Sequence, residues 1–315
     1  MNTPGLARPT PSPTDTVSVV IATVDRPELL RQAIRAALAQ EYPGPVEVLV
    51  VFDRVRAQSL TDIDVPPLRS LAVLENTRTP GLAGARNTGI LAAGGSYVAF
   101  CDDDDEWHPR KLSLQLAEWT RDPAAAAVAA GVSISADGQI TTRIPPPTVT
   151  FAHFLRSRVS EIHPSSLLFR RKDLTGRYGL VDEELPASYG EDYDLLLRSA
   201  RFGHIRSVQT PLVSVRWGRH SMFAGHWEIL AAGLTYLLQK FPEFSASRSG
   251  TARIAGQVAF AHAALGRRRE AWRWARSSLR RDPAQLRAYA AIVVGTGAVS
   301  AEALLALTQK WGRGL

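Results

Sequence analysis

Residues 102–106 are five consecutive acidic side chains that follow directly after the apolar segment 96–101. Neighbouring carboxylates repel each other, so they stay close together only where a cation or hydrogen-bond donors balance their charge. Mg²⁺ takes oxygen ligands and is often held by one or two carboxylates together with substrate phosphates. Because the run stands between a strand pattern and a helix pattern starting at Pro109, it predicts a site for a divalent cation and a nucleoside diphosphate. Its spacing excludes an EF-hand loop.

Residues 84–89 (Gly-Ala-Arg-Asn-Thr-Gly) are a second candidate for nucleotide contact. Small residues allow a ligand or another backbone to approach closely, and Arg86 can pair with a phosphate or a base edge. The same pattern also suits a helix packed tightly on a sheet, so both interpretations stay open. The run is not a P-loop, and no Rossmann glycine motif follows the first strand pattern.

Residues 189–194 (Tyr-Gly-Glu-Asp-Tyr-Asp) place acids at the start of a predicted helix. Acidic residues are favoured there by the helix dipole, which is one interpretation of the pattern. The other is catalytic: donors at a helix start keep Asp192 ionised, so that its carboxylate can accept a proton from a substrate hydroxyl.

Strands and helices must alternate to position these residues. Pro27 opens a helix with a regular apolar face, and helices are also predicted over 81–93 and from Pro109 to about Trp119. The order of elements predicts an α/β domain with a mostly parallel sheet, in which Asp53 and Asp102 follow two strands at the same edge. The predicted strands of this first part are 17–21, 46–52, 71–74 and 96–101.

The second half of the chain changes from mixed to helical patterns. An Asp-Gly pair at 137–138 predicts a hairpin between 126–134 and 140–144. From about Ser221 the pattern is helical, and residues 266–283 resemble one helical hairpin, which predicts a helical cap on the main domain. Further predicted elements are a strand at 166–169, a helix at 190–200 and an extended segment at 205–215.

Four pieces in this order resemble family 2 of the inverting glycosyltransferases with the GT-A fold, over roughly residues 17–217. They are residues 22–27, residues 51–53, the pair formed by 85–87 and 100–105, and residues 190–192. The resemblance implies an α/β fold of GT-A type: a mixed, mainly parallel sheet flanked by helices, with a C-terminal α-helical extension. We therefore expect a flexible lead at 1–16, a catalytic domain at 17–220 and a basic helical region at 221–315.

The resemblance also implies the roles of individual residues. Asp102-Asp103-Asp104 is the D-x-D element, in which Asp104 ligates Mg²⁺ or Mn²⁺ on the diphosphate. Asp192 is the base that deprotonates the acceptor hydroxyl, and a direct displacement with one base inverts the anomeric carbon. The donor is a UDP-sugar by default, and dTDP and GDP stay open because the first loop departs from the family pattern at Val24. The implied donor-binding residues are Thr23, Asp25, Asp53, Arg86, Asp102 and Asp103.

The acceptor side is less defined by the sequence. Trp217 can stack on a sugar or pack in the core. The residues predicted for the acceptor side or a lid are Glu191, His163, Trp217 and His220. A polysaccharide, a lipid-linked precursor and a natural product all stay open as the acceptor.

The net charge of +7 is concentrated at the C-terminal end. Residues 1–220 carry 24 Lys and Arg against 25 Asp and Glu, whereas residues 221–315 carry 13 against 5. Such a segment attracts anionic partners, so peripheral membrane association is one prediction and a solvated helix face is the other. Arginine outnumbers lysine 33 to 4 in the whole chain, so the arginine content by itself does not point to nucleic acid, and no nucleic-acid partner is expected.

The remaining signals concern the compartment. Cys101 is the only cysteine, which excludes a disulfide framework and fits a reducing cytosol. The first sixteen residues contain four prolines and no apolar core of a signal peptide, and the apolar stretch 288–301 is too short to span a membrane. We expect a cytoplasmic protein that works in solution or at the inner face of the membrane.

Two other functions compete with a glycosyltransferase. A sugar-phosphate nucleotidyltransferase also combines an α/β sheet with Mg²⁺, but it opens with a glycine-rich triphosphate loop and a lysine that the first loop here lacks. The other is an inert adaptor that binds a partner or membrane through the C-terminal helices, and the intact pair of Asp104 and Asp192 argues against it.

Overall fold

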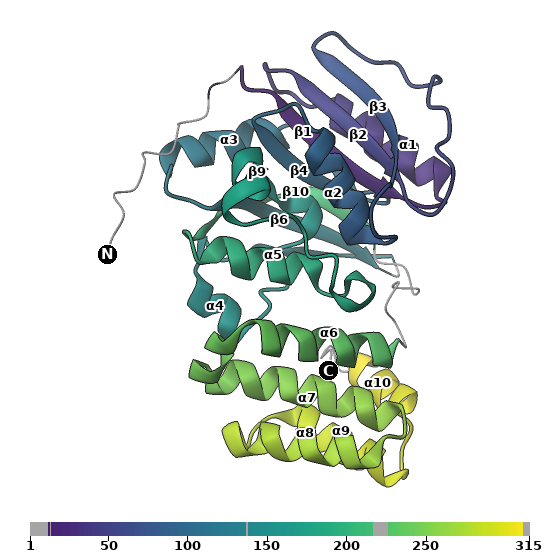
Figure 1. Cartoon of the computed structure of the whole chain (residues 1–315), viewed down its shortest axis with the longest axis vertical. Coiled ribbons are helices and arrows are strands. Elements are labelled where there is room, and N and C mark those ends of the chain that lie inside the picture. Colours follow the sequence, from purple (N-terminus) through teal and green to yellow (C-terminus); the bar gives the residue numbers. More distant parts are fainter. Residues whose placement is uncertain (1–11, 13, 137, 217–225, 311–315) are drawn as a thin grey trace. The chain divides into compact units, whose positions relative to one another are not determined.

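The computed structural model describes residues 12, 14–136, 138–216 and 226–310, which divide into two compact units. The first contains the described residues of Met1–Phe151, Val159–Glu183 and Glu191–Arg219. The second contains those of Ala152–Arg158, Glu184–Gly190 and His220–Leu315. Figure 1 shows a twisted sheet with helices around it in the first unit and a set of helices in the second.

One mixed sheet organises the first unit. Within the described residues its strand order is β3-β2-β1-β4-β9-β6-β10-β5, with β7 added to β6 and β8 to β10. The strands are β1 (Val17–Thr23), β2 (Val46–Phe52), β3 (Arg69–Glu75), β4 (Tyr97–Asp102), β5 (Glu106–Trp107), β6 (Ala127–Ala136), β7 (Gln139–Arg143), β8 (Thr148–Val149), β9 (Leu168–Arg170) and β10 (Ile205–Arg216).

The half of the sheet from β3 to β4 is parallel throughout, as the apolar strand patterns predict. Strand β2 has the predicted bounds. Strand β1 continues two residues beyond its predicted C-terminal end, and β3 starts two residues before and ends one residue after its predicted bounds. The helices of the first half are α1 (Pro27–Leu38), α2 (Leu82–Ala92) and α3 (Lys111–Arg121). This half confirms the predicted mainly parallel α/β arrangement.

Strand β9 makes the sheet mixed. It lies between β4 and β6 and is antiparallel to both, whereas β10 runs parallel to β6. The predicted hairpin is confirmed by the antiparallel pairing of β6 with β7, in which Ala136 stands opposite Gln139. Gly138 in its turn has a positive φ of 78°, which favours glycine.

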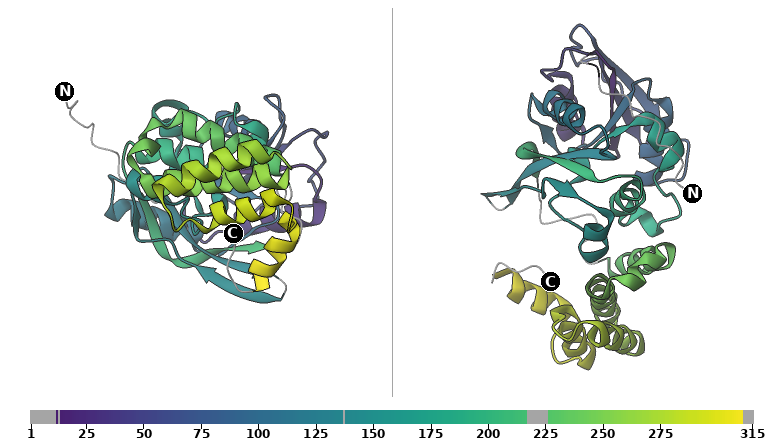
Figure 2. Two further views of the ribbon diagram at one scale, coloured as in Figure 1. Left: turned by 90° about the horizontal axis from the view of Figure 1, so that it is seen from below. Right: turned by 90° about the vertical axis from the view of Figure 1, so that its left-hand side faces the viewer.

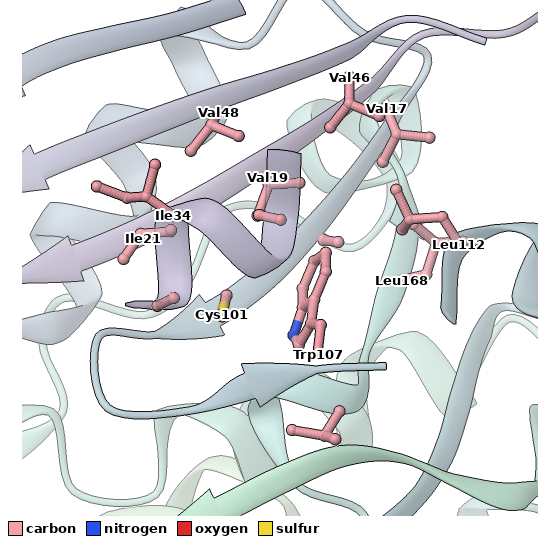
Figure 3. Close-up of a cluster of buried hydrophobic side chains, with 14 of the residues drawn as sticks. Val17, Val19, Ile21, Ile34, Val46, Val48, Cys101, Trp107, Leu112 and Leu168 are labelled. Atoms are coloured by element: carbon pink, nitrogen blue, oxygen red, sulfur yellow. The ribbon is translucent and has the colours of Figure 1, made fainter. Parts of the chain in front are cut away.

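The apolar core lies on the side of the sheet that α1 and α3 cover. Side chains alternate between the two faces of a strand, so Val17, Val19 and Ile21 of β1 point to the same side. Figure 3 shows them beside Ile34, the buried centre of the apolar face of α1. The same alternation directs Cys101 of β4 into this core and Asp102 to the opposite face.

Helix α2 covers that opposite face at very short range. A Cβ atom on Gly89 would lie 2.4 Å from Cγ1 of Val20, so only glycine fits between the helix and β1. Gly89 therefore serves tight packing of a helix on a sheet, which was one of the two interpretations of this segment, whereas Gly84 packs against the backbone of Thr79 in the preceding loop.

The second unit consists of helices built around α7. The central helix α7 packs against three others, α6, α8 and α9 (Figures 1 and 2). Residues 266–283 contain one helix, α8, and not the helical hairpin predicted for them. The observed hairpin is formed by α7 and α8, which are joined at Gly266, whose φ is +72°. The helices here are α6 (Trp227–Lys240), α7 (Arg248–Ala264), α8 (Arg268–Arg281), α9 (Leu286–Thr296) and α10 (Ala301–Lys310), with a short η4 (Pro242–Ala246).

A buried lysine lies in the core of the first unit. Lys111, the first residue of α3, is fully buried, and its Nζ lies 3.8 Å from the centroid of the Trp107 ring. The ammonium donates to Oε1 of Gln115 at 2.8 Å. One hydrogen bond and a ring face do not replace full hydration, so burial lowers the pKa of Lys111 from 10.5 to about 7.

We expect Lys111→Met to stabilise the protein most at pH 7 and below. Between pH 7 and 10.5 the unfolded chain holds a proton on this lysine that the folded chain lacks, so the wild type gains stability as the pH rises. The advantage of the variant should shrink by up to about 1.4 kcal/mol per pH unit. Urea unfolding at pH 7 and pH 9 measures this difference, with the exposed Lys172→Met as control. An advantage that stays constant with pH would contradict the prediction.

Candidate active site

The C-terminal ends of β1, β2 and β4 form one polar edge of the sheet. Thr23 stands opposite Phe52 in the register of β1 and β2, and Ala22 stands opposite Asp102 in that of β1 and β4. Asp53 follows β2 directly, and its backbone N–H donates to the carbonyl of Thr23 at 2.8 Å. Asp53 and Asp102 thus lie at the same edge, as predicted.

Asp53 is buried and organises the loop that leads to α2. Its Oδ1 accepts hydrogen bonds from Nδ2 of Asn76 at 2.7 Å and from the backbone N–H of Gly81 at 3.1 Å. Nε of Arg54 lies 3.4 Å from its other oxygen. Asp25, also predicted to contact the nucleotide, is exposed beyond the end of β1.

The four aspartates 102–105, which begin with the last residue of β4, have four different environments. The sequence indicated that a cation or donors must separate their charges, and protein donors do so in this structure. Asp102 pairs with Arg86, and Asp105 with Ser165. Asp103 accepts from Oγ1 of Thr23 at 2.7 Å, and Arg26 pairs with both Asp103 and Asp104.

Asp105 lies deepest in the cluster, and its environment favours the protonated form. Burial, followed by the charge of Asp102, raises the pKa of Asp105 to about 8, while a hydrogen bond from Ser165 acts in the opposite direction. Burial also raises the pKa of Asp103 and lowers that of His163. His163 lies beside this carboxyl: its Nδ1 is 3.3 Å from Oδ2 of Asp105 and accepts from the backbone N–H of Ser165.

Ser165 contacts the first and the fourth residue of the acid run. It lies in the short helix η1 (Pro164–Ser166) and is fully buried. Its Oγ donates to Oδ2 of Asp105 at 2.5 Å and accepts from the backbone N–H of Asp102 at 2.9 Å. The sequence singled out the segment around His163 for the acceptor side, but the partner of Ser165, sixty residues away, was not predicted.

We expect Ser165→Ala to lower the free energy of unfolding by about 1–3 kcal/mol and to weaken binding of Mn²⁺ and nucleotide, because it leaves Asp105 and the Asp102 N–H unpaired. The matched control is Ser166→Ala. Ser166 is equally buried, but its hydroxyl donates to the His163 carbonyl and does not contact the acid run. Chemical denaturation and calorimetry measure both effects. An equal loss of ligand affinity in the two variants would contradict this role of Ser165.

Arg86 joins the acid run to the start of α5 (Glu191–Ala200). The side chain is 3% exposed, donates to Oδ1 of Asp102 at 2.8 Å and pairs with Glu191. Its guanidinium lies 5.1 Å from the centre of the Phe100 ring. Burial by itself lowers the pKa of Arg86, but the carboxylates of Glu191 and Asp102 outweigh it and raise the pKa, so the group stays charged.

This ion-pair bridge places Asp192 near the acid cluster. Asp192 lies in the first turn of α5, directly after Glu191, and is buried. Its charge contributes to the raised pKa of Arg86, and it opposes the burial that lowers the pKa of His163. Glu191, predicted for the acceptor side, thus forms part of this bridge.

A second polar connection lies beside the first. Glu183 accepts from Nδ2 of Asn87 at 2.6 Å and from the backbone N–H of Thr79 at 3.2 Å, and it pairs with Arg78. Burial acts against these contacts, yet together they lower the pKa of Glu183 to about 2. Sequence reasoning missed Glu183, because no local pattern distinguishes it from a surface glutamate.

The donor set suits a hard divalent cation. Within the described part of the chain, ligand atoms of Asp102, Asp105 and His163 all lie within 4.8 Å of one another. The carboxylate oxygens suit Mg²⁺ or Mn²⁺, whereas the imidazole nitrogen suits a transition metal ion such as Mn²⁺ better than Mg²⁺. Asp104, the ligand expected from the sequence, is half-buried and pairs with Arg26 in this structure. Trp217 and His220, predicted for the acceptor side, lie outside the described residues.

Among the residues that the structure describes, none of the helices has the length and apolar character needed to cross a membrane.

Comparison with known proteins identifies the fold. S. aureus TarS 1-349 in complex with UDP-GlcNAc matches with a TM-score of 0.61 and 16% identity, over 89% of this chain and 88% of TarS 1-349. The mannosyltransferase PcManGT from Pyrobaculum calidifontis, in complex with GDP-Man and Mn²⁺, matches with a TM-score of 0.54 and 20% identity, over 96% and 82%. These likenesses confirm the predicted fold of GT-A type.

Comparison of sequences identifies the family. UDP-Glc:alpha-D-GlcNAc-diphosphoundecaprenol beta-1,3-glucosyltransferase WfaP from Escherichia coli is 30% identical over 100 residues, which is 32% of this chain and 39% of WfaP. The chain spans 37% of the length of the putative colanic acid biosynthesis glycosyl transferase WcaA from Escherichia coli and 64% of that of the amylovoran biosynthesis glycosyltransferase AmsB from Erwinia amylovora. The model of glycosyl transferase family 2 matches residues 18–176. Because this match covers half of the 315 residues, the chain belongs to glycosyl transferase family 2.

Proposed function

We propose that the protein is a metal-dependent, inverting glycosyltransferase that moves a sugar from a nucleoside diphosphate donor to an acceptor hydroxyl. One observation carries the proposal: the buried Arg86 pairs with Asp102 at the end of β4 and with Glu191 at the start of α5. This bridge supports a site in which diphosphate-binding acids and a basic carboxylate, Asp192, face the same substrate.

The donor binds along the polar edge of the sheet. We assign Thr23, Asp25 and Asp53 to the base and ribose and Asp102 and Asp103 to the ribose side. The hydrogen bonds that fix Asp53 and Asp103 support this assignment, because oriented carboxylates recognise ribose hydroxyls at little entropic cost. The resemblance implies a direct contact of Arg86 with the nucleotide. We assign it an indirect role instead, in which its ion pair orients Asp102 toward the nucleotide. The donor is a UDP-sugar by default.

A divalent cation, Mg²⁺ or Mn²⁺, belongs at the acid run, where it neutralises the charge that builds on the leaving diphosphate. Two ligand sets compete for it. The resemblance favours Asp104, and the closeness of their ligand atoms favours Asp102, Asp105 and His163. Arg26, which pairs with Asp103 and Asp104, has to move aside in the first arrangement and can stay in place in the second.

Asp192 acts as the base. Its carboxylate takes the proton of the acceptor hydroxyl while the oxygen of that hydroxyl forms a bond to the anomeric carbon. The bond from this carbon to the diphosphate breaks, and the electron pair leaves with the nucleoside diphosphate. Because attack and departure occur on opposite faces of the sugar, one displacement inverts the anomeric centre, with one base and no covalent intermediate.

The acceptor is proposed to be a lipid-linked precursor, used at the cytoplasmic face of a membrane. The name of the relative WfaP describes a polyprenyl diphosphate-linked sugar as its acceptor. The net positive charge of residues 221–315 supports a location beside anionic lipid. A polysaccharide end or a natural product remains the other class of acceptor.

Titration calorimetry with UDP, dTDP and GDP, each with and without Mn²⁺, tests the proposal. We expect one nucleotide to bind tightly only with the metal. Asp104→Ala and His163→Ala separate the two ligand sets, because each removes a residue from one set only. The exposed Asp64→Ala serves as control. If no nucleotide binds under any condition, the transferase proposal fails and the adaptor function takes its place.

A further inference from the structure

Helix α8 carries a row of exposed basic residues around a tryptophan. We call it the α8 stripe: Arg269, Trp272, Arg273, Arg276 and Arg280, all of which are exposed. Counted from Arg269, the other four stand three, four, seven and eleven residues along the chain, which places all five on one side of the helix. The row from first to last is about 16 Å long at 1.5 Å per residue.

The other side of α8 does the packing. Ala271, Ala275 and Ser278 are buried against the rest of the helical unit, and Oγ of Ser278 donates to the carbonyl of Ala252 in α7 at 2.7 Å. The α8 stripe faces away from these residues. Its composition is therefore not explained by the core of the unit.

The charges of the α8 stripe are not balanced within the described chain. None of its four arginines forms an ion pair with a residue that the structure describes, whereas Arg267, directly before α8, pairs with Glu228. Glu270 is the one acid among the fourteen residues of α8, which include six arginines. An uncompensated row of this kind attracts a polyanion.

We infer that the α8 stripe docks the protein on a membrane surface of anionic lipid headgroups. Trp272 is 54% exposed in the middle of the row, and an indole ring has the apolar body and polar N–H that suit the boundary between headgroups and acyl chains. Arginine on both sides of the ring adds attraction to lipid phosphates.

The next helix favours lipid over nucleic acid as the partner. Helix α9, which packs against α8, also exposes apolar side chains at i, i+3 and i+7: Leu286, Tyr289 and Val293. Aliphatic side chains gain from contact with lipid and add little to binding of a phosphate backbone. The inference rests on the proposed function in one respect, since a lipid-linked acceptor gives the docking surface its use.

Co-sedimentation of the full chain with vesicles tests the inference. We expect binding to vesicles of phosphatidylglycerol and phosphatidylcholine at low salt, strong weakening at 0.5 M NaCl, and no binding to phosphatidylcholine alone. Arg273→Gln/Arg276→Gln should weaken binding by about 25-fold, from roughly fivefold per arginine beside an anionic surface. Trp272→Ala should weaken it further.

Matched variants separate the α8 stripe from net charge and apolarity. Arg35→Gln/Arg110→Gln removes the same charge from exposed sites of the first unit, and Ile140→Ala removes an exposed apolar side chain there. Equal weakening by these controls would overturn the inference, as would binding to a DNA duplex but not to vesicles. If the wild-type protein binds vesicles but binds no nucleotide under any condition, the proposed function fails while the inference about the α8 stripe stands.

Discussion

Asp192→Asn is expected to lower the turnover of donor and acceptor by about a thousandfold while leaving nucleotide affinity and stability close to those of the wild type. The amide keeps the shape of the carboxylate but does not accept the acceptor proton, and general-base catalysis contributes about 10²- to 10⁴-fold. Release of nucleoside diphosphate in the presence of a lipid-linked acceptor measures turnover, and calorimetry measures affinity. A variant that keeps more than a tenth of the wild-type turnover would remove Asp192 from the role of base.

Glu191→Gln is the matched control for that experiment. Glu191 is the neighbouring acid on the same helical turn and is also buried, but its carboxylate is occupied by Arg86. We expect Glu191→Gln to lower the free energy of unfolding. Its turnover should fall only to the extent that loss of the ion pair with Arg86 displaces α5. The two variants thus separate a residue that takes a proton from one that positions the helix.

Much of the fold could be predicted because its signals are local. The apolar run of β2 predicts a buried strand with the observed bounds, and Pro27 with the apolar face after it predicts α1. The common edge of Asp53 and Asp102 follows from a general property of parallel strands. Each of these inferences needs only residues that are close together in the chain, or a rule that holds for every parallel sheet.

The contacts that build the site could not be predicted in the same way, because they join distant segments. Arg86 and Glu191 are 105 residues apart, and Ser165 and Asp105 are sixty apart. No spacing rule says which donor neutralises which acid. Strand β9 lies antiparallel between β4 and β6 and brings the segment of Ser165 to the acid run. The three residues of β9, Leu-Phe-Arg, do not encode this place in the strand order.

The protein donors that balance the charges of the four aspartates affect how the site can bind a cation. Each carboxylate has a protein donor, so the run keeps its arrangement before substrate arrives. Arg26 is the donor that is most exposed, and it serves the two middle acids, Asp103 and Asp104. A cation bound there has to compete with this arginine, whereas Arg86 is buried and keeps its partners.

Arg86→Met is expected to cost about 3–5 kcal/mol of the free energy of unfolding, the largest stability effect that we predict for this site. The substitution leaves Glu191 buried without its cation and removes the partner of Asp102, and breaking one side of a buried ion pair costs far more than the pair itself contributes. The planar guanidinium serves two carboxylates at once, so Arg86→Lys should recover only part of the loss. Urea unfolding monitored by circular dichroism measures both.

A second substitution distinguishes the buried charge from lost packing. In Arg86→Met/Glu191→Met the carboxylate left behind is removed as well, so the double variant should be more stable than Arg86→Met alone. Arg31→Met breaks an ion pair with Asp62 at the surface and should have little effect, because water solvates the remaining carboxylate. If the double variant is as unstable as the sum of its single changes, Arg86 acts through the volume that it fills over Phe100 and not through its bridge between the acid run and α5.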